Sequence, residues 1–270
     1  MILKLAKHPI EFESDGHTYK MGGLLLTGVT TILNVRAKDF LKWWTVKEMY
    51  NFLLDKQEQI KTATPEEYEA LLLEGKLAHT IKSKEALVSG QIAHKWIEAY
   101  IKGRLGRQGR LGTGGAPVAP VAPVAPVMPD DEKAAASIKA FLDWESKHKV
   151  EWLASELVLG SPKFQFAGTI DAVAMVDGVF TLVDFKTSNQ ISEECYLQTA
   201  AYWMLLDENM PEGAERPAQR LILRIPKDGK EFETQIVPTP LTFDCETFVC
   251  LRKVWRWNVN YETNVKAAKR

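Results

Sequence analysis

The stretch "GTIDAVAMVDGVFTLVDFKTS", residues 168–188, constrains the fold of this chain more than any other segment. Asp177-Gly178 stands between two apolar runs and is among the strongest short hairpin signals, because both central positions of a type I′ turn need positive φ. The segment is therefore predicted to form two antiparallel strands joined by a tight turn. Both faces of this ribbon are largely apolar, so we expect it to lie inside a sheet that helices cover.

The turn also determines which side chains meet across the hairpin. In a two-residue loop the partners have residue numbers that sum to 355, so Asp171 faces Asp184 and Thr169 faces Lys186. Opposed residues have Cβ atoms about 4.5–5.5 Å apart, and like charges at that separation are destabilising. A buried carboxylate pair is therefore expected to take up a proton or to bind a cation.

A divalent metal ion would relieve this repulsion, because Mg²⁺ and Mn²⁺ prefer oxygen ligands. Lys186 projects from the same face as Asp184, about 6.6 Å further along the strand. Two carboxylates that hold a metal ion, with an ammonium group beside them, suit the attack of water on a phosphodiester. The other interpretation of these residues is a buried Asp–Lys salt bridge in an ordinary sheet.

Further motifs stand around these acids in the order of a known family. "GTID", then "DFKTS", then a helix carrying "QTAAYWMLL" resembles the PD-(D/E)XK nuclease superfamily, over residues 85–210. The upstream "GQIAH" resembles the G-x-x-x-H helix of its RecB-like exonuclease branch, which includes phage exonucleases and the mitochondrial genome maintenance exonuclease. The resemblance implies an α/β fold, with a restriction-endonuclease-like mixed central sheet flanked by helices.

The resemblance also implies a role for each matching residue. The implied metal ligands are His94, Asp171, Asp184 and the backbone carbonyl of Phe185. Lys186 would be the catalytic lysine, and Gln198 and Tyr202 would form the Q-x-x-x-Y motif near the scissile strand. Glu156, in the preceding strand, would be an acid that supports the site. Asp184 stands where the family pattern accepts either Asp or Glu.

By this resemblance, the chain is expected to be a Mg²⁺- or Mn²⁺-dependent DNA exonuclease that acts on linear DNA in recombination, repair or end processing. A structure-selective endonuclease of the same fold and a catalytically inactive DNA-binding module are the alternatives. A single-strand annealing or single-strand-binding protein is the companion that family analogy suggests. No iron–sulfur cluster is expected, because the cluster-binding members of the branch need four cysteines and this chain has three.

Composition indicates the class of protein and its compartment. The 270 residues are 46% hydrophobic and 26% charged, with a formal net charge of −1, as in ordinary soluble globular proteins. The N-terminal segment becomes polar and acidic within its first residues, whereas a signal peptide has an apolar run there. No stretch of the chain approaches the roughly 18 apolar residues of a membrane span. The expectation is a cytoplasmic protein of a bacterium or phage-infected host cell, with no membrane partner.

The chain is expected to have two parts. Residues 1–82 would be an N-terminal hairpin and helical region packed on the nuclease core, which would comprise residues 83–270. A Gly- and Pro-rich insertion, residues 103–131, would interrupt this core as a flexible linker, with a stiffer spacer in its Pro-Val-Ala repeat. Its arginines allow a second interpretation, a mobile basic arm that contacts a phosphate backbone.

After the insertion, hydrophobic periodicity predicts the order α-β-β-β-α-β-β-α. The last helix of this order collects basic residues and tryptophans: Arg252, Lys253, Trp255, Arg256, Trp257, Lys266, Lys269 and Arg270. Such mixing suits phosphate contact combined with base stacking. The alternative is that the tryptophans belong to the core and the charges form a solvated face.

Overall fold

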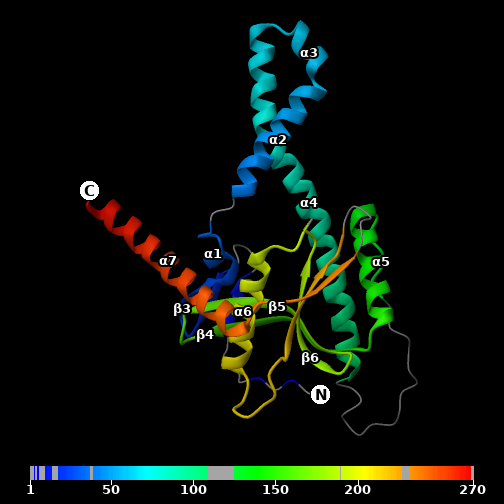
Figure 1. Ribbon diagram of the computed structural model, residues 1–270, viewed down its shortest axis with the longest axis vertical. Coiled ribbons are helices and arrows are strands. Elements are labelled where there is room, and N and C mark those ends of the chain that lie inside the picture. The colour runs from blue at the N-terminus through cyan, green and yellow to red at the C-terminus, as the bar shows by residue number, and fades with distance from the viewer. Residues whose placement is uncertain are drawn as a thin grey trace. The chain divides into compact units, whose positions relative to one another are not determined.

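A computed structural model describes residues 3, 5, 10–13, 18–36, 39–108, 125–188, 190–226 and 232–268. The chain forms two compact units, Met1–Val35 together with Ala93–Arg270, and Arg36–Ile92. The first unit contains the sheet and the helices packed on it, and the second is helical (Figure 1). This division differs from the boundary after residue 82 that the sequence suggested, because the N-terminal strands pair into the sheet of the larger unit.

Among the described residues, eight strands form one mixed sheet. The strands are β1 Ile10–Glu13, β2 Thr18–Met21, β3 Leu24–Gly28, β4 Val150–Ser161, β5 Phe166–Val176, β6 Val179–Lys186, β7 Gln219–Arg224 and β8 Glu233–Ile236. Their order is β1-β2-β3-β5-β6-β7-β8, and β4 pairs with β5 outside this path. The pairs β3–β5 and β6–β7 are parallel, and the others are antiparallel. The predicted mixed central sheet is confirmed.

The β5–β6 hairpin has the register that its turn predicted. Residue numbers across the ladder sum to 355 at every pair. Asp177 and Gly178 have φ values of 50° and 84°, in the left-handed region that a type I′ turn requires. The ladder ends one position short of Asp171 and Asp184, so the two acids stand where the strands begin to separate.

Helices cover both faces of this sheet. The helices of the larger unit are α1 Val29–Leu33, α5 Glu132–Lys147, α6 Glu193–Asn209 and α7 Leu241–Ala268, with the part of α4 (Pro65–Gln108) from Ala93 onward. On one face, Leu182 of β6 packs in a core with Leu205 of α6 and Phe248 of α7. On the other face, Phe185 of β6 meets Phe141 of α5 edge to face, at 5.7 Å between ring centroids.

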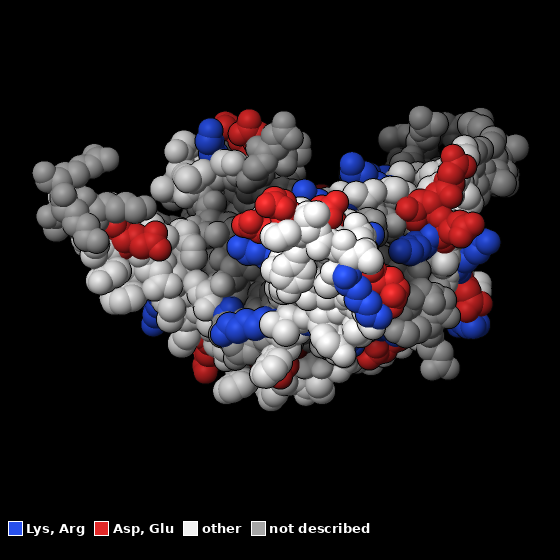
Figure 2. All heavy atoms as spheres, turned by 90° about the horizontal axis from the view of Figure 1, so that it is seen from above, with Lys and Arg blue, Asp and Glu red and all other residues white. Residues whose placement is uncertain are grey.

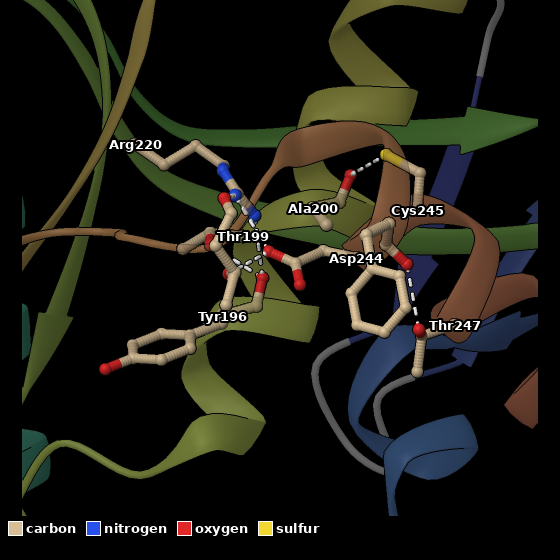
Figure 3. Close-up of polar contacts among 9 residues, drawn as sticks. Tyr196, Thr199, Ala200, Arg220, Asp244, Cys245 and Thr247 are labelled. Atoms are coloured by element: carbon tan, nitrogen blue, oxygen red, sulfur yellow. Dashed lines mark hydrogen bonds and ion pairs between the residues drawn. The ribbon is translucent and has the colours of Figure 1, made fainter.

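A buried ion pair fixes the start of α7 to the sheet. Arg220 of β7 donates to Asp244 at 2.8 Å and to the carbonyls of Tyr196 and Thr239 at 3.0 and 2.9 Å (Figure 3). The Arg220 and Asp244 side chains are only 5% and 4% exposed. Removing one partner of such a pair would leave a buried charge uncompensated, which is strongly destabilising. The first turn of α7 is therefore held firmly, and the rest of the helix extends from it.

The smaller unit, Arg36–Ile92, contains α2 (Asp39–Asp55), α3 (Gln57–Thr62) and the first part of α4. Helices α2 and α4 meet along a seam where Gly75 admits Phe52, since a Cβ at this glycine would lie 3.1 Å from the aromatic ring. Exposed apolar side chains remain on the outer sides of both helices. The unit is thus a helical hairpin held by one close-packed seam.

The first part of the predicted insertion is helical and not a coil. Residues 103–108 complete α4, and Arg104 within them forms an ion pair with Glu145 of α5 at 2.8 Å. Residues 109–124 lie outside the described part of the chain. Helix α5 then begins after Asp131, whose side chain accepts a backbone N–H of the first turn as an N-cap.

Charge is mixed on the surface of the protein. Figure 2 shows acidic and basic side chains interspersed over the described part of one face, in keeping with the formal net charge of −1. Across the helices that the structure describes, none combines the length and apolar character needed to cross a membrane.

Two buried glycines on neighbouring strands predict a contrast in stability. A Cβ at Gly168 would lie 2.8 Å from the Tyr202 ring and 3.1 Å from Val29, whereas one at Gly160 would meet flexible side-chain ends such as that of Leu26. We expect Gly168→Ala to lower the free energy of unfolding by about 1–3 kcal/mol through overpacking, and Gly160→Ala to lower it less. Urea denaturation of both variants measures this contrast, and a larger loss in Gly160→Ala would contradict it.

Candidate active site

The site lies where β3 and β6 separate along one edge of β5. Strand β3 pairs with β5 at Phe166 and Ala167, and β6 pairs with it from Ala172 onward. Between them, residues 168–171 belong to neither ladder of the described strands. Open α/β sheets bind ligands at points where neighbouring strands diverge. The opening is lined by the sequence "GTID", and Asp171 stands at its β6 end.

Asp171 and Asp184 lie together at this opening. The Asp171 carboxylate accepts the backbone N–H of Phe185 at 2.7 Å, which holds it against the strand that carries Asp184. Asp184 is fully buried, and Asp171 is half-buried. Burial raises the pKa of Asp184, the positive charge of Lys186 opposes that shift, and the charge of Asp171 adds to it. The repulsion expected from the hairpin register is therefore present.

Lys186 offsets part of the negative charge of the two acids. Its Nζ lies 2.6 Å from Asp184 Oδ2 and forms an ion pair with it, whereas Asp184 Oδ1 has no hydrogen-bond partner within the described residues. Burial lowers the pKa of Lys186, but the charges of Asp184 and Asp171 outweigh burial and raise that pKa, so the amine stays protonated.

The donors at the opening fit a divalent ion that prefers oxygen. Mg²⁺ is usually held by one or two carboxylates and several waters, and a buried carboxylate with an unsatisfied oxygen is costly without such a partner. In the described part of the chain, no three His, Cys, Asp or Glu side chains converge as a ready-made metal cluster. The carboxylates that could contact such an ion at this opening are those of Asp171 and Asp184.

His94 of α4 approaches the same place from the other face of the sheet. Its ring meets the ring of Phe185 edge to face, at 6.1 Å between centroids. It is near enough for its charge to act on Asp184, although burial and Lys186 affect the pKa of that carboxyl more. The structure thus places His94 beside the acids, without the convergence of a three-residue metal cluster.

Helix α6 brings Gln198 and Tyr202 to the opening. Gln198 Nε2 donates to the phenol oxygen of Tyr202 at 2.8 Å. Burial, and then the charges of Asp171 and Asp184, raise the pKa of Tyr202 well above its usual value, so the phenol stays protonated. Its O–H is therefore a donor. Gly168 permits this arrangement, because the Tyr202 ring occupies the place where a Cβ would lie.

Glu156 of β4 stands opposite Asp171, at the position where the β4–β5 ladder omits one pair. Its φ is 50°, in the left-handed region that non-glycine residues rarely adopt. Such backbone strain costs about 1–3 kcal/mol and clusters at functional sites. Burial, and then the charges of Asp171 and Glu98, raise the pKa of Glu156 to about 7. Glu156 is thus an acidic neighbour of Asp171.

Tyr19 of β2 is a site neighbour that the sequence did not indicate. Its hydroxyl oxygen lies 3.2 Å from Thr169 Oγ1, across 150 positions of sequence. Strand β2 reaches this place only because its partner β3 pairs with β5. No local pattern around Tyr19 signals such a long-range pairing.

Comparison with known proteins identifies the family to which this geometry belongs. The sequence model of the PD-(D/E)XK nuclease superfamily matches residues 50–256, which is more than half of the chain. No curated protein matches the chain significantly. The family match contains every site residue on α4, β4–β6 and α6 that is described above. Because both the extent of this match and the mixed sheet agree, we conclude that the chain belongs to the PD-(D/E)XK nuclease superfamily.

Proposed function

We propose that this nuclease is a metal-dependent DNA exonuclease of the RecB-like branch, working on linear DNA in recombination, repair or end processing. The observation that carries the proposal is Asp184, a fully buried carboxylate whose Oδ1 has no hydrogen-bond partner among the described residues. It lies beside a second acid, Asp171, and a protonated amine, Lys186. Membership of the superfamily implies a divalent ion and a DNA substrate. The order of "GQIAH", "GTID", "DFK" and Q-x-x-x-Y supports the exonuclease branch.

In this proposal, Asp171, Asp184 and the carbonyl of Phe185 hold Mg²⁺ or Mn²⁺, and His94 adds a ligand from α4. When bound, the ion polarises a phosphoryl oxygen and lowers the pKa of a bound water. The β5–β6 hairpin contributes rigidity, because its tight turn and apolar faces fix the separation of the two acids. Preorganised ligands of this kind spare the reaction the cost of arranging them.

Lys186, Gln198 and Tyr202 act on the phosphate in this proposal. The raised pKa of Lys186, set by the neighbouring aspartates against burial, keeps it cationic. Lys186 therefore orients the attacking water and offsets the negative charge that builds up on the phosphoryl oxygens. Tyr202 donates its O–H to an oxygen of the scissile strand, while Gln198 fixes the direction of the phenol.

Digestion of DNA of different topologies tests the exonuclease assignment. With Mg²⁺ or Mn²⁺, we expect end-labelled linear DNA to be degraded and covalently closed circles to survive, because an exonuclease needs an end. Gel analysis of linear, gapped and circular substrates, with and without the metal, measures this. Nicking of the circles would support the structure-selective endonuclease instead. Binding without any cleavage would support a catalytically inactive DNA-binding module.

Substitution of Asp184 tests the mechanism. We expect Asp184→Ala to lower turnover of linear DNA by at least about 10²–10³-fold, because the ion and the charge balance of the site depend on this carboxylate. Asp143→Ala is the matched control, since Asp143 is an exposed acid of α5. Circular dichroism confirms that both variants are folded. Unchanged turnover in folded Asp184→Ala would refute the mechanism.

A further inference from the structure

The outer part of α7 carries an aromatic pair that the core does not bury. The Trp257 and Tyr261 side chains are 63% and 56% exposed. Their rings stack nearly parallel, with 5.3 Å between centroids and 14° between planes. Each ring in such a stack has an outer face that the partner ring does not cover. Large exposed aromatics that lie together mark interaction sites on soluble proteins.

Basic side chains line the helix next to this pair. Residues three and four apart are neighbours on a helix surface, so Lys253 adjoins both Arg256 and Trp257, and Arg252 adjoins Arg256. Burial, and then the charge of Arg256, lower the pKa of Arg252. Two guanidinium groups are thus held near each other, and no described carboxylate forms an ion pair with them. Such a cluster attracts an anion.

The helix also extends beyond the core that stabilises it. Phe248 is fully buried and Trp255 is partly packed on the core, whereas most residues after Arg256 are exposed. Short helices without packing are marginal in water, so this extension would gain from a partner. From Arg252 to Ala268 the sequence has four basic residues and one acid, Glu262. The partner that complements this segment is therefore anionic.

We propose that this side of α7 binds single-stranded DNA. The residues that form it, called here the α7 platform, are Lys253, Arg256, Trp257 and Tyr261, with Arg252 at its edge beside Arg256. Bases stack on the outer faces of the two rings, and the three cations contact phosphates, a combination that binds single strands with little sequence preference. The platform is about 15 Å long, at a rise of about 1.5 Å per residue.

The α7 platform deepens the proposed function, on which it rests for the identity of the substrate. It comes from α7, whereas the catalytic groups come from α4, β5, β6 and α6, so it is a second contact with the nucleic acid. An acidic protein segment is the competing occupant. Stacking distinguishes single-stranded DNA from an acidic segment. Bases would stack on the outer faces of Trp257 and Tyr261, whereas carboxylates would pair only with the cations.

Equilibrium binding of a fluorescent 20-residue thymidine oligonucleotide tests the α7 platform. Fluorescence anisotropy is measured in EDTA, so that no strand is cut. We expect Trp257→Ala to weaken binding about 5- to 150-fold, from about 1–3 kcal/mol per stacked base, and Trp257→Phe to restore most of the affinity. Arg256→Gln should lower the slope of log affinity against log salt by about one unit.

Matched controls separate the α7 platform from a general effect of surface substitution. Phe243 is 63% exposed, as Trp257 is, but lies on the first turn of α7, and Phe243→Ala is expected to bind as the wild type does. Lys139 is an exposed lysine of α5, and Lys139→Gln serves as the control for Arg256→Gln. An oligonucleotide of abasic sites should bind wild type and Trp257→Ala equally, because it has no bases to stack.

Each outcome decides between the hypotheses. Equal affinity of Trp257→Ala and the wild type for the thymidine strand would overturn the α7 platform. Light scattering that shows loss of self-association in Trp257→Ala, with strand affinity unchanged, would assign α7 to contact with a second copy and also overturn it. Strand binding through Trp257 in a protein that cleaves no DNA would contradict the nuclease proposal alone. Cleavage without a contribution of Trp257 to binding would contradict the α7 platform alone.

Discussion

The repulsion between two carboxylates at the end of one β-hairpin is the constraint on which the site depends. Asp171 and Asp184 are set side by side by the tight turn at Asp177-Gly178, and one of them is fully buried. In the described site, the cation that pairs directly with them is Lys186, and Asp184 Oδ1 has no hydrogen-bond partner there. A protein tolerates this arrangement when a further cation shares the charge, and here that cation would be the nuclease's divalent ion.

The sheet gives this pair access to a substrate. Strands β3 and β6 take successive parts of one edge of β5, and the acids lie where the two separate. Gly168 leaves room for Tyr202 against β5, and Glu156 adopts a left-handed φ directly opposite Asp171. The left-handed φ of Glu156 and the missing Cβ of Gly168 are thus located at the opening. The Arg220–Asp244 ion pair and the aromatic core around Phe185 stabilise the surrounding layers.

The sequence predicted the features that depend on short spacings. The Asp177-Gly178 turn gave the β5–β6 register, and with it the shared face of Asp171, Asp184 and Lys186. The order of elements after the insertion and the mixed sheet were predictable from hydrophobic periodicity. The pairing of segments far apart in the sequence was not predictable in this way. The parallel β3–β5 contact and the approach of Tyr19 to Thr169 are therefore seen only in the structure. The helical state of residues 103–108 was missed because the glycines there favour a coil, whereas the contact of Arg104 with Glu145 joins residues far apart in the sequence.

Mn²⁺ binding measured by titration calorimetry is the most direct test of the carboxylate pair. We expect the wild-type protein to bind Mn²⁺ with measurable heat, and Asp171→Asn to weaken this binding about tenfold or more, because one charged ligand is lost. Asp143→Asn on the exposed side of α5 should bind as the wild type does. Equal Mn²⁺ affinity in the wild type and a folded Asp171→Asn protein would show that the two acids do not share an ion.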